Sequence, residues 1–174
     1  MTTASPQIRE PIQMTSTPVA AGFAGLYERH SEAVFRAALR ITGRPADAED
    51  VLQTVFLRVL SRSEEDEVAG RPAAYFRRAA VNAAVDLLRR RAVHAETAYD
   101  DLAPHAAVET SLLLKEQLRR AIATLDSEDA TLFLLRYVEG LSNQELAEVF
   151  RLEKNNVAVR LHRIRMRLQA EMER

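Results

Sequence analysis

Residues 144–167 read QELAEVFRLEKNNVAVRLHRIRMR, and this stretch decides the class of fold. A short helical pattern over 144–150 is followed by three residues and then by a longer helical pattern that begins at Lys154. In the longer pattern apolar residues recur every three or four positions, which is the spacing of one buried helix face. They are Val157, Leu161, Ile164 and Leu168. Two helices joined by so short a connection are typical of a helix-turn-helix motif, whose second helix enters the major groove of DNA.

The other side of the longer helix carries side chains suited to DNA. Asn can pair with adenine and Arg with guanine, Val can touch the methyl group of thymine, and further arginines suit phosphates. Two amphipathic helices joined by a turn also occur in many bundles, but a second helix with five basic residues and no acid over 154–168 favours DNA binding. The residues expected to face DNA are Lys154, Asn155, Ala158, Val159, Arg160, His162 and Arg163, with Arg160, Arg165 and Arg167 placed for phosphates.

The rest of the chain has helical rather than strand periodicity. Helices are predicted over 25–42, 45–61, 72–92, 112–125, 128–139, 144–150 and 154–172. Ser142 and Glu145 form the Ser-x-x-Glu pattern of a capping box, and Gly140 suits the end of the preceding helix. The pattern therefore predicts an all-α protein of two small helical domains joined by a flexible linker. We expect a disordered tail over 1–20, a first domain over 21–93, the linker over 94–110 and a second domain over 111–174.

Composition excludes several classes of protein. The 174 residues include no cysteine, and the four histidines have no metal-ligand spacing. There is no Ser, His and Asp set and no glycine-rich phosphate loop, so we expect no enzyme, no cofactor and no metal. Charged residues interrupt every apolar run and no signal pattern opens the chain, which predicts a cytoplasmic protein without membrane insertion. Net charge is −1, but two segments are strongly basic, 71–91 and 154–168.

The second half resembles region 4 of the extracytoplasmic-function (ECF) group of sigma-70 family factors. The resemblance rests on Leu134-Leu-Arg-Tyr-Val-Glu-Gly-Leu-Ser142, on Glu145-Leu-Ala147 and on the spacing of Val157, Arg160, Leu161, Arg163 and Leu168. It implies that this half reads the distal (minus-35) promoter element, with Ala158, Val159, His162 and Arg163 nearest to the bases. The sequence departs from the family pattern at Arg151, Glu153, Asn156 and Ala158. At Arg151 the family carries Gly, so either Arg151 adopts a backbone shape that Gly accepts more cheaply or the turn differs.

Residues 48–56 are similar to region 2.2 of the same family, and this similarity implies binding to the clamp helices of the largest polymerase subunit. Asp50 and Gln53 are three positions apart on one helix face, with Leu57 next along it, and Asp47 adds negative charge. That face differs from the apolar stripe that contains Leu52 and Val59. Acids in a first helical turn also suit the helix dipole alone. The residues expected to bind polymerase are Asp47, Asp50, Gln53 and Leu57.

Residues 75–91 resemble region 2.4, which implies contact with the proximal (minus-10) promoter element. Phe76, Ala80, Ala83 and Leu87 form an apolar stripe on the expected helix. A polar stripe lies beside it, and Tyr75 in this stripe could stack on single-stranded bases or pack in the protein. The loop 61–70 is where relatives hold a flipped base. The residues of the polar stripe are Tyr75, Arg78, Asn82, Asp86, Arg89 and Arg90.

The resemblance covers both halves in order and implies an alternative sigma factor. Such a factor binds core RNA polymerase at the clamp helices and the flap, and directs promoter recognition, DNA melting and transcription initiation. Family members commonly also bind an anti-sigma factor. Two other readings stay open from the residues: a dimeric helix-turn-helix regulator, or a sigma mimic that acts by protein–protein sequestration.

Overall fold

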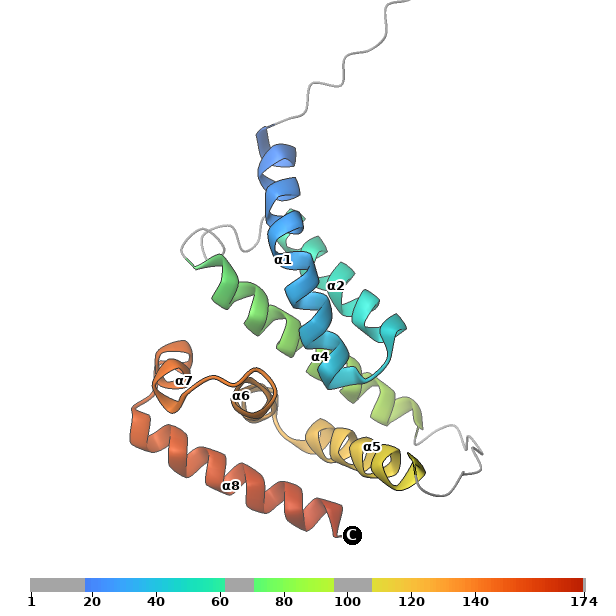
Figure 1. The fold of residues 1–174 in the computed structure, drawn as a ribbon. Helices are drawn as coiled ribbons and strands as arrows, with labels where there is room; N and C mark the ends of the chain where they lie inside the picture. The colour runs from blue at the N-terminus through green and yellow to red at the C-terminus, as the bar shows by residue number, and fades with distance from the viewer. Residues whose placement is uncertain (1–17, 62–70, 96–107, 174) are drawn as a thin grey trace, which may run out of the picture.

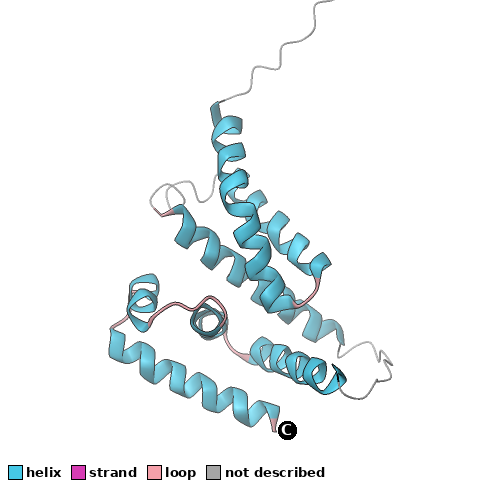
Figure 2. Cartoon of the chain, viewed as in Figure 1, coloured by secondary structure: helices cyan, strands magenta, loops and turns pink. Residues whose placement is uncertain are grey.

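The computed structural model describes residues 18–61, 71–95 and 108–173, and every regular element in these ranges is a helix (Figure 2). The first half contains α1 (Pro18–Thr42), α2 (Pro45–Leu60) and α4 (Pro72–Ala95). The second half contains α5 (Val108–Thr124), α6 (Ser127–Tyr137), α7 (Asn143–Phe150) and α8 (Lys154–Met172). The all-α class is therefore confirmed. Most of the expected tail, the loop 62–70 and the centre of the expected linker lie outside the described residues.

Three helices are longer than the sequence pattern predicts. α1 begins at Pro18 rather than near residue 25, α4 continues to Ala95, and α5 begins at Val108. The added residues include several alanines, the best helix former, and no residue within α4 or α5 after the first turn breaks the helix. Residues 94–95 and 108–110, expected in the linker, are therefore helical.

Aromatic rings fill the centre of the first half. Phe56 of α2 stacks on Phe76 of α4 with ring centroids 5.0 Å apart, and His30 of α1 stacks on the same ring at 4.7 Å. Phe23 and Tyr27 close this cluster from the start of α1. Burial, helped by nearby Arg29, lowers the pKa of His30. These contacts join α1, α2 and α4 into one packed unit.

A capping box at the start of α7 and the buried stripe of α8 stabilise the second half. The side chain of Ser142 accepts from the backbone N–H of Glu145 at 3.2 Å, while Glu145 accepts from the N–H of Ser142 at 2.7 Å. The predicted capping box is confirmed. The four apolar residues predicted as the inner stripe of α8 are all buried, which confirms the period read from the sequence. Figure 1 shows α8 running beneath α5, α6 and α7.

α4 is buried on two sides. Its predicted stripe, which includes Phe76 and Leu87, packs on the first half, as the Phe56 contact shows. Val81, Val85 and Leu88 are buried as well, and at 100° per residue they lie on the opposite side of the helix. α4 therefore packs against α1 and α2 on one side and against α5 and α6 on the other (Figure 1). The two halves share one continuous apolar core.

The turn between α7 and α8 has the shape of a glycine turn, although Arg151 occupies it. Arg151 has φ 54° and ψ 42°, in the left-handed region. The N–H of Leu152 donates to the carbonyl oxygen of Ala147 at 2.9 Å, as in a glycine-ended helix. Of the two alternatives left by the sequence, the first is correct, and Arg151 adopts the backbone shape that Gly accepts more cheaply.

We predict that Arg151→Gly stabilises the chain. The left-handed conformation costs a non-glycine residue about 1–2 kcal/mol, part of which is offset by the greater freedom of Gly in the unfolded chain. The net gain should be about 0.5–1 kcal/mol in the free energy of unfolding, measured by urea denaturation. Arg151→Ala is the control, because Ala keeps the left-handed cost and should show no such gain. Equal stability of the Gly and Ala variants would contradict the account.

Candidate nucleic-acid interface

The outer face of α8 is open to solvent. It lies opposite the buried stripe, and Val159 on it is 51% exposed. α8 begins at Lys154, and the side chain of Glu153 before it makes no capping hydrogen bond to the start of the helix. The face presents basic, amide and small apolar groups together, a mixture that can contact base edges and phosphates. Its exposed members are Lys154, Asn155, Ala158, Val159, His162 and Arg163.

Arg160 lies apart from this open face. Its Nε donates to Oδ1 of Asp129 at 2.5 Å, and its Nη2 donates to Oε2 of Glu128 at 2.7 Å. Arg167, about two helical turns further along the same side, donates to Oδ2 of Asp129 at 3.3 Å. The arginines of α8 thus divide into an outward group and a pair directed at the start of α6. The sequence alone did not indicate these acidic partners, because acids in a first helical turn, such as Glu128 and Asp129, suit the helix dipole with or without an arginine nearby.

The electrostatics of this cluster follow from partial burial and close pairing. Burial raises the pKa of Asp129, although its hydrogen bond from Arg160 acts in the opposite direction. Burial also acts to raise the pKa of Asp126, but its hydrogen bond from the Asp129 backbone holds that pKa below the usual value. For Arg160, burial is outweighed by Asp129 and Glu128, which raise its pKa. Arg160 therefore ties α8 to α6 with a charge that is always present.

On α2, the structure brings together three of the four residues expected to bind polymerase. Asp50, Gln53 and Leu57 are exposed along one face, and Leu57 is 62% exposed. Leu60, 47% exposed, extends the same surface. Asp47 is different: it is buried and pairs with Arg91 of α4. The sequence signalled a negative first turn but not this pairing, which joins residues 44 positions apart.

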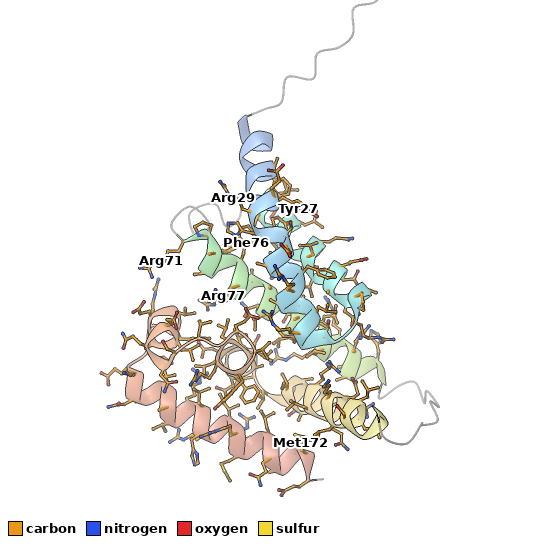
Figure 3. The ribbon with its side chains drawn as sticks, in the orientation of Figure 1. Tyr27, Arg29, Arg71, Phe76, Arg77 and Met172 are labelled. Atoms are coloured by element: carbon orange, nitrogen blue, oxygen red, sulfur yellow. The ribbon has the colours of Figure 1, made fainter. Side chains whose placement is uncertain are left out.

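The polar stripe of α4 faces the second half of the chain. Asn82 Oδ1 lies 2.7 Å from the Thr131 hydroxyl of α6, and Arg89 donates to the carbonyl oxygen of Leu125. Arg78 donates to the carbonyl oxygen of Val149 at 3.3 Å and lies over the ring of Phe150, 5.3 Å from its centroid. Figure 3 shows Arg71 and Arg77 on this same side of α4.

The remaining stripe residues have other surroundings. Tyr75 is half-buried against Phe76, edge to face, with ring centroids 5.3 Å apart. Asp86 lies 3.8 Å from Arg58 of α2, and Arg90 is exposed. The six residues of the stripe therefore lie along one side of α4. In this structure three of them, Arg78, Asn82 and Arg89, contact the second half.

Two further findings concern the part of the chain that the structure describes. Within it, no helix combines the length and apolar character needed to cross a membrane. Within the same ranges, no group of three or more His, Asp or Glu side chains could hold a metal ion.

Both halves match known sequence families. Residues 26–93 match Sigma-70 region 2, and residues 115–168 match Sigma-70, region 4, which together cover more than two thirds of the chain. The order and spacing of the two regions agree with the two halves of the structure.

Several curated proteins are similar to this chain over most of its length. The chain is 22% identical to the ECF RNA polymerase sigma factor SigW of Bacillus subtilis, over 86% of this chain and 88% of that protein. It is 29% identical to the ECF RNA polymerase sigma factor SigE of Mycolicibacterium smegmatis, over 83% of this chain and 59% of that protein. It is 28% identical to the RNA polymerase sigma-E factor of Streptomyces coelicolor, over 81% of this chain and 80% of that protein.

A solved structure of the sigma factor RpoE with the anti-sigma factor NepR from Bartonella quintana covers 87% of this chain and 97% of that one, at 19% identity and a TM-score of 0.49. The assignment rests on the two matched regions and on the curated relatives. The chain belongs to the sigma-70 family and is an ECF sigma factor, which directs promoter recognition in transcription initiation.

Proposed function

We propose that this sigma factor divides promoter recognition among three surfaces. The exposed face of α2 binds core RNA polymerase, the polar stripe of α4 meets the minus-10 element, and the outer face of α8 reads the minus-35 element. The exposed basic face of α8, opposite a fully buried stripe, is the observation that carries the proposal. The chain takes no catalytic part itself and acts in the cytoplasm, where it recruits the polymerase to promoters.

The proposed contacts of α8 follow the geometry of helix-turn-helix proteins. In these proteins the recognition helix lies in the major groove and contacts base edges, while the helix before it crosses the DNA backbone. Lys154 and Asn155 are at the start of α8, and Ala158, His162 and Arg163 lie on the same exposed side. Ala158 and Val159 are small and apolar, which suits contact with thymine methyl groups.

Within this scheme Arg160 is a positioning residue. Its guanidinium is directed to Asp129 and Glu128 of α6, so it fixes the orientation of α8 and leaves the phosphate contact to Arg165. Hydrogen bonds between charged groups are stronger and more directional than neutral ones. A helix held in this way keeps the angle at which its outer face enters the groove.

The proposed polymerase surface combines polar and apolar groups. Asp50 and Gln53 can form hydrogen bonds and ion pairs, and the exposed Leu57 and Leu60 can become buried by the partner. This mixture is usual at protein interfaces, which have an apolar centre and a polar rim. We assign its partner as the clamp helices of the largest polymerase subunit. The start of α5, where Leu112, Leu113 and Leu114 are exposed, is assigned to the flap.

We also propose an anti-sigma factor as a protein partner of this chain, as the family resemblance implies. A self-sufficient dimeric regulator would have no use for the exposed α2 face, and a sequestering mimic would have no use for the basic face of α8. Binding to polymerase and transcription from a promoter distinguish these readings.

We predict that the double substitution Asp50→Ala and Gln53→Ala weakens binding to core polymerase by about tenfold or more, because interface residues of this kind commonly contribute about 1 kcal/mol each. Biolayer interferometry with core polymerase measures it, and run-off transcription from a mapped promoter should fall in parallel. Glu32→Ala, an exposed acid of α1, is the control and should change neither. Unchanged polymerase affinity would remove the assignment of the α2 face, and failure of the wild type to open any mapped promoter would remove the proposed function.

We predict that Arg163→Ala weakens binding to the minus-35 element by about 1–3 kcal/mol and relaxes the preference at one base pair, because Arg163 is placed to read a base. The target sequence comes from genome-wide mapping of bound sites, and a mobility-shift series with single-base variants measures the effect. Equal loss on all sequences would instead mark Arg163 as a phosphate contact.

We predict that Arg160→Ala and Arg165→Ala have different effects on the salt dependence of DNA binding. Arg165 is exposed and contacts a phosphate in this scheme, so its loss should lower the salt slope of DNA binding by about one. Loss of Arg160 leaves Asp129 without its main partner, so stability should fall by about 1–3 kcal/mol while the salt slope stays the same. A reduced slope for Arg160→Ala would contradict its positioning role.

A further inference from the structure

We infer that the cleft between the start of α4 and α7 is a binding site for a free nucleotide, a ligand that joins an aromatic ring system to phosphate groups. The cleft has a volume of about 810 Å³, and small-molecule sites commonly have roughly 300–1,000 Å³. The first two turns of α4 line one side of it, and α7 with the turn that follows lines the other. Leu135 and Leu141 add apolar surface.

The lining provides flat surfaces for a nucleobase. Tyr75 of α4 and Phe150, the last residue of α7, both line the cleft. The guanidinium of Arg78 lies over the Phe150 ring, 5.3 Å from its centroid. Nucleobases stack on aromatic rings and on guanidinium planes, and both kinds of surface are present here. The ring system of a nucleotide therefore has more than one place to stack.

Four arginines line the cleft, and two of them are paired with acids of the protein. Arg71 lies 4.0 Å from Glu148 of α7. Arg77 lies 3.8 Å from Glu139, which follows α6 (Figure 3). These two arginines are therefore largely neutralised before any ligand arrives.

The other two arginines, Arg78 and Arg151, keep their positive charge. Arg78 donates to the carbonyl oxygen of Val149 at 3.3 Å, and that acceptor is neutral. Arg151 is exposed, and among the described residues its guanidinium has no hydrogen bond and no ion pair. A phosphate monoester carries about two negative charges and accepts charge-assisted hydrogen bonds from arginine. The two arginines without an acidic partner therefore suit the phosphate end of a nucleotide.

Three glutamates also line the cleft, and each has a partner within the protein. Glu128 accepts from Arg160 at 2.7 Å, and Glu148 has the pair described above. Glu145 accepts from the N–H of Ser142 at 2.7 Å in the capping box. The acids are thus engaged elsewhere, and the two unpaired arginines are the charged groups left for a ligand.

Backbone strain at Arg151 supports a site on independent grounds. Arg151 has φ 54°, in the left-handed region that Gly adopts at lower cost. Strained residues other than Gly cluster at ligand sites, where the strain is maintained for function. A glycine at this position would relieve the strain but would remove a guanidinium from the lining. A phosphate ligand therefore gives a reason for arginine in a turn that favours glycine.

Isothermal titration calorimetry of the full chain with ATP, without DNA or polymerase, tests the site. ATP should bind, and adenosine and inorganic pyrophosphate should each bind at least about tenfold more weakly, because each lacks either the phosphates or the ring. Absence of ATP binding would overturn the inference. Adenosine or pyrophosphate that binds as tightly as ATP would overturn it as well.

Variants at Arg151 separate binding from stability. Arg151→Gly should weaken ATP binding by about tenfold, because a charge-assisted hydrogen bond is lost, although the chain itself becomes more stable. Arg151→Ala keeps the strain and should lose the same affinity. Arg120→Ala, the control, removes an exposed arginine of α5 outside the cleft and should bind ATP as the wild type does. Equal losses in Arg120→Ala and Arg151→Gly would mean unspecific charge attraction and overturn the site.

Two further arms test the ring and the source of the nucleotide. Phe150→Leu should weaken ATP binding but leave pyrophosphate binding unchanged, with thermal denaturation as the check that the variant is folded. A loss that is equal for both ligands would contradict stacking in the cleft. A single-stranded DNA oligonucleotide should bind equally to the wild type and to Arg151→Gly. Arg151-dependent binding of the oligonucleotide, tighter than that of ATP, would assign the cleft to a DNA strand and overturn the proposal of a free nucleotide.

Discussion

The burial of α4 on both sides is the constraint on which the rest of the structure depends. Phe76 and Leu87 lie in the core with α1 and α2, and Val81, Val85 and Leu88 lie on the side that faces α5 and α6. A helix with one apolar stripe would leave two independent domains. With two apolar sides, α4 becomes the shared wall of a single core, and the polar residues between those sides are placed at the seam between the halves.

That position explains why the two DNA surfaces differ. α8 is the outermost helix of the second half, so its outer face stays exposed while Arg160 and Arg167 anchor it to the acids of α6. The stripe of α4 is at the seam, so Asn82, Arg78 and Arg89 contact the second half. The exposure of the outer face of α8 thus follows from the packing of the second half alone. The exposure of the α4 stripe depends on how the two halves are arranged.

Local features were predictable from the sequence. The inner stripe of α8, the capping box at Ser142 and the helical class follow from periodicity and from side chains that act within one turn. The features that the sequence did not reveal join distant residues: Asp47 with Arg91, Asp129 with Arg160, and the second buried side of α4. An acid in the first turn of a helix has the same sequence signal whether it meets water or an arginine. The polar stripe of α4 was read as a free face for a similar reason, because its partner Thr131 is 49 positions away.

The contact between Asn82 and Thr131 should be present in the free chain in solution. The direct measurement is a nuclear Overhauser spectrum of the isotope-labelled wild-type protein, without polymerase or DNA. We predict a cross-peak between the side-chain amide protons of Asn82 and the methyl group of Thr131. Absence of that cross-peak in the free chain, together with separate tumbling of the two halves, would contradict it.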